Sequence, residues 1–216
     1  MPDGRISNKI WSKNPDFLDS MNEDIFDEGY YARYYENRLT RVADPVHFVR
    51  LGRFVGAYCG LLGIRVRSIL DLGCGIGTLK KPLLKRFPKA AYTGVDVSPY
   101  ACAKFGWERA SASDYSPGHR FDLVVCHDVL QYLSDKEAGA TIKNFDALCR
   151  SVLYFSVLTK EDWDQNCDKS LTDSDVNLRT TNWYRRRLQR HFRNLGGGVY
   201  TSRSLDVVLY SLEHLD

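Results

Sequence analysis

The stretch Ile69-Leu70-Asp71-Leu72-Gly73-Cys74-Gly75-Ile76-Gly77-Thr78-Leu79 decides the fold. An aliphatic run meets three alternating glycines, and a helical pattern of leucines follows from Leu79 to Phe87. Glycines let a backbone approach a ligand closely, and a helix N-terminus that follows them adds free amide donors. The spacing is G-x-G-x-G; the dinucleotide fingerprint needs glycine where Thr78 stands, and the lysine of a phosphate-binding P-loop is absent. We therefore predict a strand, a ligand-binding loop and a helix.

Short apolar runs and helical patterns alternate on the carboxyl-terminal side of this loop. We predict strands over 67–72, 91–97, 121–129 and 151–158, helices over 79–87, 99–107 and 136–149, and a short segment at 111–115. Such alternation is typical of an α/β protein with a Rossmann-like, doubly wound, mostly parallel sheet. The tail, over 198–204 and 205–212, predicts a hairpin that closes the sheet. Residues 1–65 form a predicted N-terminal helical cap on the sheet domain of 66–216, the two making one compact unit.

The cap contains two local signals. Asp44 followed by Pro45 predicts a helix start, with the helix running to about Leu62 before Gly63. Upstream, the segment 29–35 holds four tyrosines. A helix there puts Tyr30 and Tyr34 on one face and the other two tyrosines on the neighbouring stripe. These rings either pack on the sheet or form a lid over a ligand, especially a cationic one.

Composition excludes several classes of protein. The 216 residues are 44% hydrophobic and 26% charged, which is ordinary for a globular protein, and the net charge of +3 is too small to predict nucleic-acid binding. No run approaches the roughly 18 apolar residues of a membrane-spanning helix, and the amino terminus lacks a secretory signal. The six cysteines include no C-x-x-C pair, so neither disulfides nor a metal site is expected. We expect a cytoplasmic protein.

An acidic residue closes the second predicted strand. Asp96 follows Gly77 by 19 positions, where a carboxylate can accept both hydroxyls of a ribose. Asp71, at the end of the first strand, can bind the amides of the turn or the ammonium group of a ligand. Each carboxylate can also be explained without a ligand, Asp71 as a helix cap and Asp96 as a strand end.

Four segments in order resemble the motifs of class I S-adenosylmethionine-dependent methyltransferases. They are DLGCGIG at 71–77, GVDVSP at 94–99, SD at 113–114 and FDLVVCHDVLQYL at 121–133. The resemblance covers roughly residues 66–160, and four motifs at consistent spacing are far more specific than one glycine loop. It implies S-adenosylmethionine as the cofactor and an antiparallel last strand in the sheet.

The resemblance also implies a role for each motif residue. Gly73, Gly75 and Gly77 would make room for the methionine and ribose parts of the cofactor. Asp96 would hold the ribose hydroxyls with Val97 against the adenine, and Ser113 and Asp114 would meet the adenine edge. Cys126 to Asp128 would border the methionine and methyl group.

Methyl transfer is an in-line displacement, so the protein mainly positions the acceptor and, where needed, removes its proton. His127 is the histidine that the motifs place beside the methyl group, and we predict it as a base. Because side chains alternate along a strand, either Cys126 or His127 points into the core. Tyr30 and Tyr34 are the candidate catalytic residues of the cap.

The acceptor side is predicted from the long connection 159–181 and the helix after it. This connection contains Trp163. It has two interpretations: a loop that binds the acceptor, or an acidic loop that is only solvated. In the helix, Tyr184, Leu188, Phe192 and Leu195 form the predicted buried stripe. The arginines of this helix either form a solvated surface or bind an acidic partner, which would be a substrate or a carrier protein. We predict Trp163, Arg179, Trp183 and Tyr184 as substrate-binding residues.

These signals together predict a methyltransferase that acts on a small molecule, without nucleic acid or membrane as a partner. An alternative enzyme transfers or cyclises the aminobutyryl arm of the cofactor and releases methylthioadenosine. A base-modifying nucleic-acid methylase is disfavoured, because residues 126–129 read CHDV and lack the Asn/Asp-Pro-Pro-aromatic motif. A cofactor-binding protein without catalysis is the remaining alternative.

Overall fold

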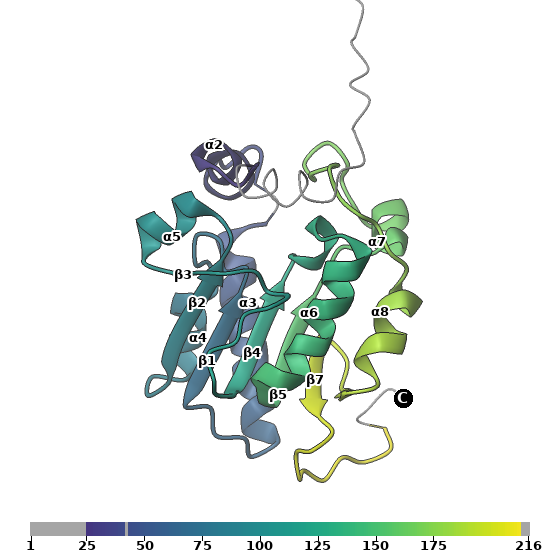
Figure 1. The fold of residues 1–216 in the computed structure, drawn as a ribbon. Coiled ribbons are helices and arrows are strands. Elements are labelled where there is room, and N and C mark those ends of the chain that lie inside the picture. The colour runs from purple at the N-terminus through teal and green to yellow at the C-terminus, as the bar shows by residue number, and fades with distance from the viewer. Residues whose placement is uncertain (1–24, 42, 213–216) are drawn as a thin grey trace, which may run out of the picture.

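The protein folds around one central sheet, here described from a computed structural model in which residues 25–41 and 43–212 are placed. Within those residues the sheet has seven strands in the order β3-β2-β1-β4-β5-β7-β6 (Figure 1). The strands are β1 (Ser68–Leu72), β2 (Ala91–Asp96), β3 (Glu108–Arg109), β4 (Phe121–His127), β5 (Cys149–Ser156), β6 (Phe192–Asn194) and β7 (Val199–Ser202).

Strand direction confirms the predicted fold class. Strands β1 to β5 pair in parallel, with Leu72 beside both Val95 of β2 and Cys126 of β4. Strand β7 runs antiparallel to its neighbours β5 and β6. The carboxyl ends of β1, β2, β4 and β5 therefore meet at one edge of the sheet, which is where ligands of open α/β sheets bind.

Helices cover both faces of the sheet, making three layers (Figure 1). The helices of the described residues are α2 (Glu28–Tyr31), the π-helix η1 (Ala32–Glu36), α3 (Pro45–Leu61), α4 (Lys80–Arg86), α5 (Pro99–Phe105), the 3-10 turn η2 (Leu130–Tyr132), α6 (Asp135–Leu148), α7 (Lys160–Gln165) and α8 (Thr181–Leu188). One core packs α3 and α4, through Val55 and Leu83, against Ile69 of β1. The other packs α6 and α8, through Phe145 and Leu188, against the opposite face.

Local capping explains why the two longest helices begin where they do. The Asp44 side chain accepts the Val46 amide at 2.8 Å ahead of Pro45, as the sequence predicts. Ser134 and Glu137 form a reciprocal capping box that starts α6. Helix α3 packs so closely on α4 that a Cβ at Gly52 would lie 2.7 Å from the Cβ of Pro82. It therefore forms part of a helical layer on the sheet. Residues 1–24 of the predicted cap lie outside the described residues.

The carboxyl-terminal prediction is corrected by the structure. The hairpin consists of β6 and β7, not of 198–204 and 205–212, and residues 205–212 contain no strand. Helix α8 ends at Leu188, so Phe192 and Leu195 lie beyond the helix that was predicted to carry them. Gly196, Gly197 and Gly198 all have positive φ, which lets the chain turn back sharply and pair β7 with β5. Among the described helices, none is long and apolar enough to span a membrane.

Candidate functional site

The glycine loop at the carboxyl end of β1 is packed from two sides. Gly73, Gly75 and Gly77 have φ values of 69°, 51° and 74°, which favour glycine at each position. The amides of Gly73 and Cys74 both donate to the Val95 carbonyl, at 2.8 and 3.1 Å. A Cβ at Gly73 would collide with the Val129 side chain. Backbone conformation and crowding therefore both require glycine here.

Trp107 supports the loop from the β2 side, and sequence reasoning missed it. Its Nε1 donates to the Gly75 carbonyl at 2.8 Å. A Cβ at Gly77 would lie 2.7 Å from its Cζ2, and one at Gly94 would lie 2.6 Å from its Cε3. The Lys80 ammonium lies 4.7 Å from the indole ring centre. A glycine inside a strand is a signal of close approach by another group, so Gly94 was the available clue.

Asp96 lies at the end of β2, beside the loop and beneath the tyrosine segment. Its buried carboxylate accepts the amides of Gly75 at 2.7 Å and Ser98 at 2.9 Å. Burial raises the pKa of Asp96, while these hydrogen bonds and one from Tyr31 oppose the rise. The Tyr31 ring also covers Gly75, where an added Cβ would lie 3.2 Å from Cε1, and it stacks on Tyr100.

A pocket of about 390 Å³ opens where the glycine loop meets the ends of β1, β4 and β5. This volume is in the range of small-molecule sites. Its walls are formed by Tyr35, Ala43, Asp44, His47, Phe48, Asp71, Gly73, Cys74, Gly75, Thr78, Leu79, His127, Asp128 and Ser156. Asp71 accepts the Tyr92 hydroxyl at 2.6 Å. Burial raises the pKa of Asp71 to about 6, against the opposing effects of that hydrogen bond and of His127.

His127 and Asp128 form a hydrogen-bonded pair in the pocket wall. His127 Nδ1 lies 3.1 Å from Asp128 Oδ2, and the Ser156 hydroxyl donates to Asp128 Oδ1 at 3.4 Å. Asp128 has φ of 55°, the one positive φ among the described non-glycine residues, and its amide donates to the Ser156 carbonyl at 2.9 Å. Backbone strain of this kind is often found at functional sites.

The electrostatics of this pair favour a charged imidazolium. Burial lowers the pKa of His127, but the charge and hydrogen bond of Asp128 outweigh burial and leave the pKa raised above its ordinary value. For Asp128, burial acts to raise the pKa, and the neighbouring His127 holds it below its ordinary value. The ring of His47 lies 6.3 Å from that of His127, at the exposed side of the pocket.

The structure decides between Cys126 and His127. Cys126 is fully buried in the core beneath α6 and α8, so its side chain faces away from the pocket. Ser113 and Asp114 follow β3 and are not among the pocket residues; the Ser113 hydroxyl lies 2.9 Å from that of Ser111, and Asp114 is exposed. Val97 directly follows Asp96 and is half-buried.

The tyrosine segment lies across the same edge of the sheet, as α2 in Figure 1. Tyr30 and Tyr34 have ring centres 4.9 Å apart, as the predicted shared face requires. The Tyr30 and Tyr132 hydroxyls are 2.9 Å apart, and burial raises the pKa of Tyr30. Tyr35, however, is the tyrosine that lines the pocket, and neither Tyr30 nor Tyr34 does.

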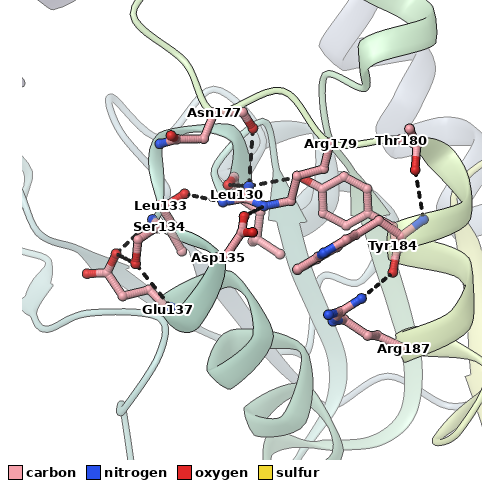
Figure 2. Close-up of polar contacts among 11 residues, drawn as sticks. Leu130, Leu133, Ser134, Asp135, Glu137, Asn177, Arg179, Thr180, Tyr184 and Arg187 are labelled. Atoms are coloured by element: carbon pink, nitrogen blue, oxygen red, sulfur yellow. Dashed lines mark hydrogen bonds and ion pairs between the residues drawn. The ribbon is translucent and has the colours of Figure 1, made fainter.

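Arg179, predicted as a substrate-binding residue, is buried in a hydrogen-bond network and lines neither the pocket beside the glycine loop nor the second pocket described below. Figure 2 shows its guanidinium among the turn of η2, the start of α6 and the start of α8. Nε donates to Asp135 at 2.7 Å, Nη1 to the carbonyl of Leu130 at 2.8 Å, and Nη2 to that of Leu133 at 2.5 Å. Nη1 also contacts the Tyr184 hydroxyl at 3.3 Å. These contacts tie the long connection to the segment after β4.

The other predicted acceptor residues also lie outside the pocket beside the glycine loop. Trp183 is covered by the guanidinium of Arg187, whose Cζ is 3.6 Å from the ring centre. Tyr184 is a buried core residue that lines a second pocket, described below. Trp163 on α7 has the Lys169 ammonium 5.5 Å from its ring centre. Both tryptophan rings are therefore in contact with positively charged side chains of this protein, Lys169 and Arg187.

Comparison with known proteins agrees with this architecture. Residues 70–151 match a family described as a methyltransferase domain. Trans-aconitate 2-methyltransferase of Enterobacter sp. (strain 638) is 38% identical over 80 residues, which is 34% of this chain and 32% of that protein. Carboxy-S-adenosyl-L-methionine synthase of Chromohalobacter salexigens is 30% identical over 148 residues, which is 59% of this chain and 53% of that protein. The chain thus spans a third to about half the length of these curated relatives.

A solved structure covers more of the fold. Magnesium protoporphyrin IX methyltransferase from Synechocystis PCC 6803, with bound S-adenosylhomocysteine, superposes with a TM-score of 0.58 at 19% identity. The match covers 86% of this chain and 100% of that one. At this identity the likeness concerns the fold, and it agrees with the family match over the motif region. Residues 70–151 of the chain therefore match a methyltransferase domain, and the fold around them is like that of a solved methyltransferase.

Proposed function

We propose that this protein transfers a methyl group from S-adenosylmethionine to a small-molecule acceptor. One observation carries the proposal: the glycine loop and the His127–Asp128 pair line a single pocket at the carboxyl edge of the sheet. Two relatives at the level of sequence, a trans-aconitate 2-methyltransferase and a malonyl-[acyl-carrier protein] O-methyltransferase, act by name on acidic acceptors. We further propose that the protein acts in the cytoplasm and without a nucleic-acid partner.

The residues around the loop fit the cofactor. The three glycines have positive φ, Gly73 and Gly75 line the pocket without a side chain, and Asp96 presents a buried carboxylate beside the loop. Asp96 would hold the ribose hydroxyls, and Asp71 in the pocket would meet the ammonium group. When bound, the sulfonium supplies an electrophilic methyl group. Ser113, Asp114 and Val97 remain candidates for the adenine end.

His127 is the residue that we assign as general base. Asp128 binds Nδ1, so Nε2 is the nitrogen that would take a proton from an acceptor hydroxyl or carboxyl group. Asp128 would then stabilise the resulting imidazolium, in the way a carboxylate stabilises a catalytic histidine. Because the pKa of His127 is raised, the basic form increases as the pH rises through that value.

The tyrosine segment would close the pocket against water. Tyr35 is in the pocket wall and Tyr31 covers Gly75, so these two rings are better placed than Tyr30 and Tyr34 to meet a bound cation. Tyr30 and Tyr34 would then act by packing, with the Tyr30–Tyr132 contact fixing the segment over the site. The Tyr31 hydroxyl forms a hydrogen bond with the Asp96 carboxylate. A ribose bound to Asp96 would either bind beside this hydroxyl or displace it.

The proposal is tested with S-adenosylmethionine and S-adenosylhomocysteine. Calorimetry should give saturable binding of both by the whole chain, and absence of binding contradicts the proposal. Purine products formed from S-adenosylmethionine, alone and with candidate acceptors, are then identified by mass spectrometry against a control without protein. S-adenosylhomocysteine together with a methylated acceptor supports methyl transfer. Methylthioadenosine above the control would instead identify arm transfer or cyclisation, which none of the relatives named above favours.

A further inference from the structure

A second pocket of about 280 Å³ lies beside the first, at the end of β5. It is lined by Tyr154, Phe155, Ser156, Val157, Thr159, Thr181, Tyr184, Arg185, Asn194, Gly197, Gly198 and Tyr200. These residues come from β5, the start of α8 and the β6–β7 hairpin. Because β7 runs antiparallel to β5, the loop before β7 returns to the carboxyl edge of the sheet, where the first pocket opens. Both pockets therefore lie at the ligand-binding edge.

The two pockets share a wall. Ser156 lines both, and its hydroxyl donates to Asp128 in the first pocket. Tyr154 lines the second pocket, and its ring stacks on that of His127 at 6.1 Å. A molecule seated in the second pocket is thus separated from the His127–Asp128 pair by a single layer of side chains, Tyr154 and Ser156.

Arg185 brings an uncompensated positive charge to the second pocket. Among the residues that the structure describes, no carboxylate pairs with Arg185. Two nearby arginines differ: Arg179, which precedes α8, is bound by Asp135, and Arg187 on α8 lies over Trp183. Glu161 binds the start of α8, where its Oε2 accepts the amide and hydroxyl of Thr181 at 2.9 and 3.3 Å.

Further polar groups line the same pocket. Asn194 Oδ1 accepts the Gly196 amide at 2.9 Å, which leaves the Asn194 NH₂ group as a donor. Burial raises the pKa of Tyr200, so its hydroxyl remains a neutral donor, while the charge of Arg185 acts in the opposite direction. The pocket thus combines one cation with neutral donors, a combination that suits a single carboxylate.

We propose that the second pocket is an acceptor subsite, in which Arg185 binds a carboxylate of a small organic acid. The inference rests on the proposed methyl transfer and names the class of its acceptor. The acid would place one carboxylate at Arg185 and extend past Ser156, so that its reacting oxygen meets His127. A single guanidinium balances one carboxylate, whereas a phosphate dianion would keep an unpaired charge.

The test uses succinate as the probe, with the uncharged succinamide and inorganic phosphate beside it. Titrations are followed by amide chemical shifts of the S-adenosylhomocysteine-bound protein, with Gly197 and Gly198 as reporters of the pocket. We compare Arg185→Met with Arg186→Met, an exposed arginine of the same helix that is not a pocket residue. Neither substitution removes a buried contact, so both variants should fold.

Succinate should shift both glycine amides saturably and bind Arg185→Met at least ten times more weakly, with Arg186→Met unchanged. Succinamide should bind at least ten times more weakly than succinate. Absence of succinate binding, or equal binding by both variants, overturns the proposal; tighter binding of phosphate overturns the assignment to carboxylates.

The two proposals can fail separately. S-adenosylhomocysteine should bind Arg185→Met as it binds the parent protein, because Arg185 lies outside the cofactor pocket. If the parent protein binds no S-adenosylhomocysteine, methyl transfer fails, and titration of the free protein with succinate still decides for or against the carboxylate subsite. If the cofactor binds but succinate does not, the subsite alone fails.

Discussion

Gly94→Ala tests whether Trp107 supports the glycine loop. Gly94 lies in β2, and its φ is outside the positive range, so alanine meets no conformational strain there. The obstacle is steric. The added Cβ would lie 2.6 Å from Cε3 and 2.9 Å from Cδ2 of Trp107, and 3.0 Å from Sγ of Cys74. Since carbon atoms pack at roughly 3.5–4.0 Å, the indole must move by about 1 Å.

The expected magnitude follows from two opposing terms. Overpacking a close-packed interior costs about 1–3 kcal/mol. Replacing glycine by alanine at an unstrained position returns about 0.4–1 kcal/mol through the unfolded chain. The difference of the two ranges is about 0–2.6 kcal/mol, and we expect Gly94→Ala to reduce the free energy of unfolding by its central value of about 1.3 kcal/mol. Displacement of Trp107 would also disturb its hydrogen bond to the Gly75 carbonyl and so weaken cofactor binding.

Urea unfolding and calorimetry with S-adenosylhomocysteine measure the two effects. Gly139→Ala is the matched control, because Gly139 lies inside α6 and an added Cβ there meets nothing within 4 Å. That variant should be more stable by about 0.5–1 kcal/mol and bind normally. In a Trp107→Leu background, the cost of Gly94→Ala should largely disappear. If Gly94→Ala is as stable as the parent and binds S-adenosylhomocysteine equally well, the reasoning about Trp107 is refuted.

Three further outcomes are expected. Asp96→Ala should weaken S-adenosylmethionine binding by about 1–3 kcal/mol in calorimetry, the scale of a lost charged hydrogen-bond pair; unchanged affinity removes Asp96 from the ribose site. Asp128→Asn should lower the pKa of His127, followed by NMR titration with His127→Gln for assignment, and an unmoved pKa contradicts the pairing. The pKa of His127 in the folded protein lies above its ordinary value, so protonated His127 stabilises the fold at low pH. This contribution to the free energy of unfolding disappears as the pH rises through that pKa, and Asp128→Asn should remove the dependence. Arg179→Met should lower the free energy of unfolding by about 2–4 kcal/mol, since it leaves buried carbonyls without donors; a loss below about 1 kcal/mol would show that the network in Figure 2 contributes little.

The position of Arg179 shows how the acceptor side is organised. This residue was expected in a binding pocket because it precedes a helix start and follows a long polar connection. Instead, its donors are used by carbonyls of the segment after β4 and by Asp135. Arg185, one helical turn into α8, lines the second pocket instead. A sequence pattern cannot distinguish these two arginines, because their partners lie on elements far away along the chain.

The amino-acid sequence by itself determined the parts of this protein that depend on local patterns. Alternating strand and helix periodicities predict the doubly wound sheet, Asp44 with Pro45 predicts the start of α3, and the spacing of Gly73 to Asp96 predicts the binding edge. These features follow from backbone conformation and from residues within a few turns of one another.

Tertiary structure decided which side chains meet at the site. It turned His127 to the pocket and Cys126 to the core, brought Tyr35 and His47 to the same cavity, and set Trp107 beneath a loop 32 residues away. It also formed the final hairpin from β6 and β7. Each of these outcomes depends on how helices and strands pack across the sheet, so the physical reason is non-local contact, which no sequence window contains.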